Sequence, residues 1–264
     1  MCVCVYTVCG TRSPAFAAFQ QSTVIKQLSA GDGPCSQRAA LAALQRWLPV
    51  GPGGATPEAG TWERLFRASA DGKTPSAFHR FCDRFHGGTV VLVHGTAEDG
   101  SMVACGAYTA IEWDAPRRGV RHVPEPDNDD GGPGSFLFCL QDGSATKPVR
   151  LPIAKRERAV VMDANFGPLF GAGPDLRIGA HSDLLGRLGS RAHTAAPVSS
   201  YDASEAARAG CVLFRMPAAG PGDAGDGEAG AGTAGDAADV APVKFTAVEV
   251  EVFGVEAADG GDDA

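Results

Sequence analysis

Short runs of β-branched and aromatic residues, separated by clusters of turn-forming residues, constrain the fold of this chain most. Between these runs the sequence has no helical segment long enough for the crossover that parallel neighbouring strands require. We therefore predict an α+β fold, mainly β, in which two antiparallel sheets form a sandwich with a few flanking helices. The predicted strands cover residues 89–94, 102–110, 135–141, 159–162, 176–178, 211–216 and 245–255.

The last predicted strand has the clearest alternation of residue types. Over Val248–Phe253 the valines alternate with Glu249, Glu251 and a phenylalanine. Because successive side chains of a strand point to opposite faces, we expect the valines to be buried and the two glutamates to face solvent. The carboxylates would lie about 7 Å apart on one face, which would also suit an acid and a base. A solvated face is the simpler interpretation.

A helix with an aromatic face is predicted to begin after Thr74. Thr74 is a favourable N-cap, and Pro75 suits the first helical position, where its fixed φ helps and its missing N–H costs nothing. At about 100° per residue the apolar side chains fall on one side and the charged ones point away. Gly87 and Gly88 end the helix before the first strand. The residues expected to face the core are Phe78, Phe81, Cys82 and Phe85.

The helix belongs to a longer stretch, Trp62 to Asp83 (WERLFRASADGKTPSAFHRFCD), that resembles the opening of the TLDc domain of oxidation resistance proteins and their relatives. Further blocks follow in the order that the family has. They are CGAY at 105–108 with Trp113, SFLFCL at 135–140, NFGPLFGAGPDLRI at 165–178, SYD at 200–202 and VEVEVFGV at 248–255. Cys105, Ala107 and Ala172 depart from the pattern, since they replace a phenylalanine and two glycines.

These six ordered blocks lie within residues 36–255 and make the resemblance specific. The residues that carry it, in structural or partner-binding roles, are Trp62, Ser69, Asp71, Gly72, Phe78, His79, Cys82, Gly106, Tyr108, Trp113, Phe136, Phe138, Gly167, Pro168, Phe170, Gly171, Gly173, Leu176, Tyr201, Glu249, Glu251 and Phe253.

The resemblance implies a protein that acts by binding rather than by catalysis. It implies protection against oxidative damage and, as in several members of the family, binding of the peripheral subunits of the vacuolar-type proton ATPase to regulate its assembly. No catalytic residue, cofactor or metal follows from it. The alternative is a thiol-dependent antioxidant or another enzyme that uses Cys82, Cys105 or Cys139. A scaffold module from a larger arrangement is a further alternative.

The chain is predicted to hold one TLDc-like domain, at residues 36–255. Its first helix should begin at Ser36 and stop at Pro49, with three leucines on one side. We assign no structure to residues 1–35. The segments 114–134 and 217–242 are polar or rich in glycine and alanine, so we expect them to be disordered loops. Residues 256–264 form an acidic tail.

The distribution of charge limits the classes of partner. From Pro217 onward there are eleven acidic residues and one lysine, a net charge of −10, whereas residues 1–216 carry +2. No basic stripe interleaved with aromatic residues occurs, so we do not expect nucleic-acid binding. No run approaches 18 apolar residues, so we expect no membrane insertion. The eight dispersed cysteines fit reduced thiols in an intracellular, cytoplasmic protein, and the N-terminus lacks the basic region of a secretory signal.

Several residue groups invite a chemical interpretation. His79, Cys82 and His86 lie within two predicted helical turns, but Cys82 falls among phenylalanines, which favours packing over a metal site or a nucleophile. Cys2, Cys4 and Cys9 lack the spacing of a zinc knuckle. The glycines of 165–173 are followed by Pro174 and a strand rather than by a helix, so they are expected to shape a turn and not to bind phosphate.

Overall fold

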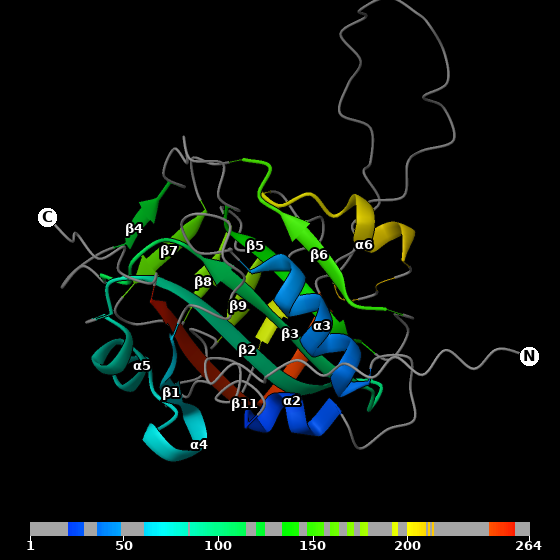
Figure 1. Ribbon diagram of the computed structural model, residues 1–264, viewed down its shortest axis with the longest axis horizontal. Coiled ribbons are helices and arrows are strands. Elements are labelled where there is room, and N and C mark those ends of the chain that lie inside the picture. Colours follow the sequence, from blue (N-terminus) through cyan, green and yellow to red (C-terminus); the bar gives the residue numbers. More distant parts are fainter. Residues whose placement is uncertain are drawn as a thin grey trace, which may run out of the picture.

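The computed structural model describes residues 21–28, 36–48, 61–83, 85–114, 120–124, 134–142, 147–155, 159–163, 168–171, 175–178, 192–194, 200–209, 211, 213 and 243–256. These residues form a mainly β fold with few helices, as predicted (Figure 1). The strand pairs among them are all antiparallel, which also confirms the prediction. None of the helices in these ranges is long and apolar enough to span a membrane.

The long strand β11 (Val243–Glu256) connects the two halves of the fold (Figure 1). Along one edge it pairs with β2 (Gly88–Ala97). The sheet continues from there through β3 (Met102–Thr109), β5 (Phe136–Gln141) and β6 (Val149–Pro152). β11 is therefore an interior strand, although it lies at the end of the described chain.

Along its opposite edge β11 pairs with two further strands. Its start pairs with β10 (Ala192–Thr194), and its last residues pair with β1 (Thr61–Arg67). From β10 the hydrogen-bonded order runs through β9 (Leu176–Ile178), β8 (Leu169–Phe170), β7 (Val160–Asp163) and β4 (Val120–Val123).

The helices are short, and α2 (Thr23–Leu28), α3 (Gln37–Trp47) and α5 (Pro75–Cys82) begin with side-chain caps. α2 and α3 pack on one face of the sheet, and Figure 1 shows α3 in front of β2 and β3. Ser36 is the N-cap of α3, as predicted, since its Oγ accepts a hydrogen bond from the N–H of Ala39 at 3.2 Å. α5 is capped in the same way by Thr74. The shorter helices are α4 (Ala68–Asp71) and α6 (Ser204–Arg208).

Alternation along β2 divides the interior into two cores. Val91 and Val93 belong to the strand core, which includes Val160 and Phe170 from the other half of the fold. Val90, Leu92 and Phe253 belong to the helix core, where they pack with buried residues of α2 and α3. Both faces of the central strands are therefore covered.

Some predicted elements differ from the structure. α5 ends at Cys82, earlier than predicted, so Phe85 lies beyond the helix. Phe81, which was predicted to face the core, is only half-buried. Cys211 and Leu213 are not in a strand, although a strand was predicted at 211–216. The segment 114–134 was predicted to be a loop throughout, but Val120–Val123 forms β4 and pairs with β7. The acidic tail was predicted to begin at residue 256, but Glu256 is the last residue of β11. The prediction for residues 217–242 and that for the rest of the tail lie outside the described residues.

Candidate functional site

Glu251 on β11 is a fully buried carboxylate that holds α2 and β1 against the sheet. Its Oε1 accepts a hydrogen bond from Arg67 Nε at 2.7 Å and lies 3.2 Å from the N–H of Thr23. Its Oε2 accepts hydrogen bonds from Ser22 Oγ and from the N–H of Val24 at 3.3 Å. The backbone N–H groups of Thr23 and Val24 have no partner within their own helix, so Glu251 acts as a cap supplied by a distant strand.

Glu249 plays the same part at α4. Its Oε1 accepts a hydrogen bond from the backbone N–H of Ser69 at 3.0 Å, and the side chain is 7% exposed. Asp71 completes the junction, since its Oδ2 accepts the N–H of Arg67 at 2.7 Å. Both glutamates thus have structural partners, which does not favour an acid and base pair.

The prediction that Glu249 and Glu251 face solvent is wrong, because helices cover the face of β11 on which they lie. A β-bulge between Ala247 and Glu249 also shifts the alternation. Val248 is the extra residue at this bulge and is 50% exposed. A bulge moves all later side chains of the strand to the other face, so Val248 does not share the buried environment of Val250.

His94 on β2 is a buried residue that the sequence analysis missed. It lies opposite Glu249 in the β2 and β11 pair and is 6% exposed. Its Nε2 has no hydrogen-bond partner among the described residues. Burial lowers the pKa of the His94 imidazole, and the nearby Glu249 carboxylate offsets part of this effect. His94 is therefore a neutral side chain whose protonation would be costly inside the fold.

Aromatic residues of the sequence motifs pack within the strand core. Trp113 packs edge to face against Phe78 with ring centroids 5.1 Å apart, and against Phe170 at 5.9 Å. Trp113 Nε1 donates a hydrogen bond to Thr89 Oγ1 at 2.8 Å. Phe66 packs on Phe78 from β1. The ring contacts join α5, β1 and β8, and the hydrogen bond of Trp113 adds β2, so the role of these residues in the fold is structural.

A second aromatic group packs under α3. The rings of Tyr108 and Phe136 lie 5.3 Å apart, and Trp47 contacts both Phe136 and Phe138. Gly106 leaves room for this packing, because a Cβ there would lie 2.6 Å from the ring of Phe138 and 1.9 Å from a backbone oxygen of β2.

The glycine-rich block between β8 and β9 holds a buried carboxylate. Gly171 has a φ of +85°, and a Cβ at this position would lie 2.6 Å from Asp175 Oδ2. Asp175 Oδ2 accepts the backbone N–H of Ser200 at 2.6 Å, and the hydroxyl of Tyr201 donates to the carbonyl of Ala159 at 2.9 Å. The prediction that this glycine shapes a turn between strands is confirmed.

His79, Cys82 and His86 do not converge. His79 Nδ1 lies 3.1 Å from Asp83 Oδ1, whereas the exposed His86 lies 3.3 Å from Glu112 Oε2. Cys82 is fully buried, and burial raises the pKa of its thiol well above the usual value. A thiol in this environment is a poor nucleophile.

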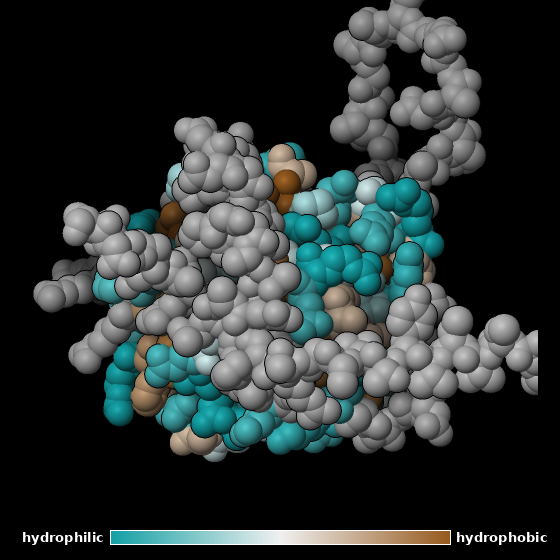
Figure 2. Space-filling model, viewed as in Figure 1, coloured by the Kyte–Doolittle hydropathy of each residue, from teal (hydrophilic) through white to brown (hydrophobic). Residues whose placement is uncertain are grey.

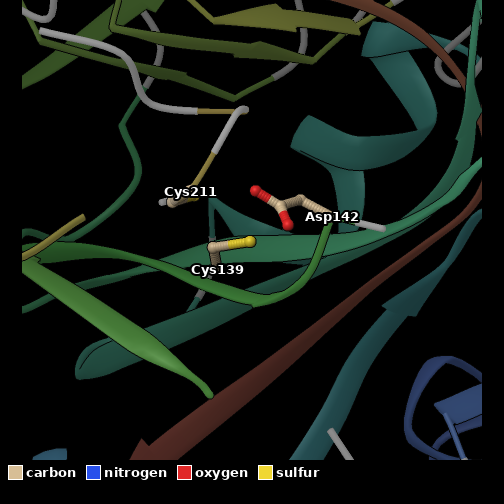
Figure 3. Close-up of side chains that lie close together, drawn as sticks. All are labelled: Cys139, Asp142 and Cys211. Atoms are coloured by element: carbon tan, nitrogen blue, oxygen red, sulfur yellow. The ribbon is translucent and has the colours of Figure 1, made fainter. Parts of the chain in front are cut away.

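Three further thiols gather on the other side of the strand core. Cys105 and Cys139 lie directly opposite each other in β3 and β5, and Cys211 follows α6. Cys139, Asp142 and Cys211 are buried, with their sulfur and carboxylate oxygen atoms within 4.8 Å of one another (Figure 3). A hydrogen bond with Cys211, together with burial, raises the pKa of the Cys139 thiol. No sequence pattern predicted this cluster, because Cys211 is far from β5 along the chain.

The remaining predicted residues serve the fold or lie outside the described residues. Ser69 and Gly72 are exposed near α4, and Gly72 has a φ of +109°. Trp62, Pro168, Leu176 and Phe253 are buried. The predictions for Gly167, Gly173, Cys2, Cys4 and Cys9 lie outside the described residues.

A search of the sequence against models of known protein families finds no match. A search of curated proteins likewise finds none. The TLDc resemblance therefore remains a prediction that depends on the ordered motifs.

Proposed function

We propose that this chain is a TLDc-like interaction module that acts by binding a protein partner and not by catalysis. In this proposal the two runs of strands pack as a sandwich of antiparallel sheets. The shared strand core, to which both runs contribute, supports that arrangement. Within that core the motif residue Trp113 packs against the motif residues Phe78 and Phe170, which supports the idea that the motifs belong to one domain.

The structural use of the reactive side chains is the observation that most favours binding over catalysis. Glu251 and Glu249 accept hydrogen bonds from backbone N–H groups of α2 and α4, so their oxygens are engaged. Burial raises the pKa of the Cys82 and Cys105 thiols, which disfavours the thiolate that a nucleophile requires. In the part of the chain that the structure describes, the candidate glutamates are therefore engaged in structural hydrogen bonds, and the candidate thiols are in environments that disfavour reaction.

The resemblance suggests the kind of partner and the process. The module would protect against oxidative damage by binding peripheral subunits of the vacuolar-type proton ATPase and regulating its assembly. On the face shown in Figure 2, the described residues are mostly hydrophilic, with apolar residues scattered among them. Interfaces between proteins that also exist separately are about as polar as the rest of the surface, so such a face suits a regulated partner.

Affinity purification with the full chain as bait tests this proposal. We expect peripheral subunits of the vacuolar-type ATPase to be enriched over a bait of unrelated fold. The variant Cys82→Ala/Cys105→Ala should capture the same subunits, since neither thiol reaches the surface. If the folded wild-type chain enriches none of these subunits, the proposed partner is wrong.

A further inference from the structure

The cluster of Cys139, Asp142 and Cys211 brings three metal-binding side chains to one buried position. The sulfur atoms and a carboxylate oxygen lie within 4.8 Å of one another. Among the described residues no other group of three or more His, Cys, Asp or Glu side chains lies this close. In Figure 3 the Cys139 sulfur and the Asp142 carboxylate point toward each other, and Cys211 lies beside them on a separate segment.

The chain geometry explains how Cys139 and Asp142 come to share one side. In a continuing strand, residues three apart point to opposite faces. β5 ends at Gln141, so the chain turns and the Asp142 side chain enters the interior, where it is 6% exposed. The end of the strand therefore creates a pair of ligands that its alternation would have separated.

Backbone hydrogen bonds fix the segment that supplies the third ligand. The N–H of Cys211 donates to the carbonyl of Ala206 at 2.9 Å and so ties this segment to the end of α6. The N–H of Leu213 donates to Asp142 Oδ2 at 3.4 Å. Cys139 and Asp142 are thus positioned at the end of β5, and a backbone hydrogen bond ties Cys211 to the end of α6.

The ligand types favour a thiophilic ion. Thiolate sulfur favours Zn²⁺ and similar ions, whereas Ca²⁺ and Mg²⁺ favour sites made of oxygen atoms alone. Tetrahedral Zn²⁺ with bonds of about 2.3 Å to sulfur places two sulfur atoms about 3.8 Å apart. The ligand atoms of the cluster lie within 4.8 Å of one another, so small side-chain rotations would bring the two sulfur atoms to the spacing that Zn²⁺ requires.

We propose that Cys139, Asp142 and Cys211 bind one Zn²⁺ ion, which links the end of β5 to the segment after α6. Cys105 lies opposite Cys139 in the β3 and β5 pair, but its sulfur is not among the ligand atoms that lie within 4.8 Å of one another. Each cysteine that binds loses its thiol proton to solvent, and no electron is transferred. The site is buried within the strand core, so its role is to stabilise the fold and not to activate water.

Titration with Co²⁺ alone tests the site in the full-length, reduced and metal-free protein. Co²⁺ reports tetrahedral thiolate binding by its visible absorption, and Zn²⁺ should displace it. We expect one equivalent to bind per chain, and we expect Cys211→Ala and Asp142→Ala each to weaken binding by at least about tenfold. Cys82→Ala removes a buried thiol outside the cluster, so this control should bind Co²⁺ as the wild type does.

Three results would overturn the proposal. The first is a wild-type protein that does not bind one equivalent of Co²⁺. The second is Co²⁺ affinity that is unchanged in both Cys211→Ala and Asp142→Ala. The third is loss of Co²⁺ binding in Cys2→Ala/Cys4→Ala/Cys9→Ala, which would place the site at the N-terminal cysteines. X-ray absorption at the zinc edge identifies the ligand atoms in the unmutated, Zn²⁺-loaded protein. This measurement therefore does not depend on whether a variant folds. We expect sulfur together with oxygen around the ion, and a shell without sulfur would contradict the assignment.

Discussion

Arg67 Nε lies 2.7 Å from Glu251 Oε1, and this ion pair joins β1 to β11 across 184 residues of sequence. Glu251 is fully buried, whereas the side chain of Arg67 is 21% exposed. The same carboxylate also caps α2, so one charged group supports three elements. Such a group is compensated only while its partners stay in place.

Removing the charge of Glu251 should destabilise the protein. Glu251→Gln keeps the volume but weakens the bonds to Arg67, Ser22 and the first N–H groups of α2, and we expect a loss of about 2 to 3 kcal/mol in the free energy of unfolding. Glu63→Gln, on the exposed face of β1, should stay within about 0.5 kcal/mol. Urea denaturation of both variants measures the difference. Equal urea midpoints for the two variants would show that the buried carboxylate of Glu251 does not stabilise the fold.

Gly171 and Gly100 form a matched pair for testing the role of Asp175. Both have positive φ, +85° and +84°, but a Cβ at Gly171 would meet the Asp175 carboxylate whereas at Gly100 there is open space. Gly100→Ala should cost about 1 to 2 kcal/mol from backbone strain alone. Gly171→Ala should cost more, since Asp175 must also move. Chemical denaturation that finds equal losses would argue against a tight turn at Gly171.

The aromatic face of α5 predicts unequal effects of truncation. Phe78 is fully buried between Phe66 and Trp113, so Phe78→Ala should cost about 3 to 5 kcal/mol. Phe81 is half-buried and lies beneath the Arg80 guanidinium at 5.0 Å. Phe81→Ala should therefore cost clearly less than Phe78→Ala. A larger loss for Phe81→Ala in thermal or urea unfolding would mean that α5 is rotated about its axis.

His94 should make stability fall at mildly acidic pH. Burial lowers its pKa below the usual value of 6.5 in the folded protein, so the unfolded chain binds the proton more readily. The contribution of neutral His94 to stability is then fully present above about pH 6.5 and is lost as the pH falls below that value. The free energy of unfolding decreases by at most about 1.4 kcal/mol per pH unit.

The variant His94→Gln removes this titration. Between pH 7.5 and pH 5.5 its unfolding free energy should fall less than that of the wild type, by up to about 1.4 kcal/mol. His86→Gln is the control, since His86 is exposed. Identical pH profiles for wild type and His94→Gln would exclude His94 as the source.

Local sequence patterns predicted the strands and helices whose residue types follow a regular pattern. β2, β3, β5 and β11 follow from runs of β-branched residues, and α5 follows from Thr74 and Pro75. β1 was missed because a bulge between Arg64 and Phe66 breaks its alternation, so that Trp62 enters the helix core and Phe66 the strand core. A single sequence shows no sign of a bulge of this kind.

The candidate sites depended on tertiary contacts that no local pattern contains. Glu249 and Glu251 alternate like solvated residues, and only the packing of α2 and α4 against β11 shows that they are buried caps. Cys139 and Cys211 come together through the fold of β5 and α6, which no residue spacing reveals. The inert environment of Cys82 was predictable, because its neighbours at helical spacing are phenylalanines.

The most direct test of a binding function is protection against peroxide in cells that lack their own TLDc protein. The variant Cys82→Ala/Cys105→Ala removes two of the three thiols that the alternative enzyme could use, and both are fully buried. Its folding and partner capture are checked in parallel. We predict that the folded variant protects cells as well as the wild type does. Loss of protection in a variant that still folds and still captures its partner would contradict the binding account and favour thiol chemistry.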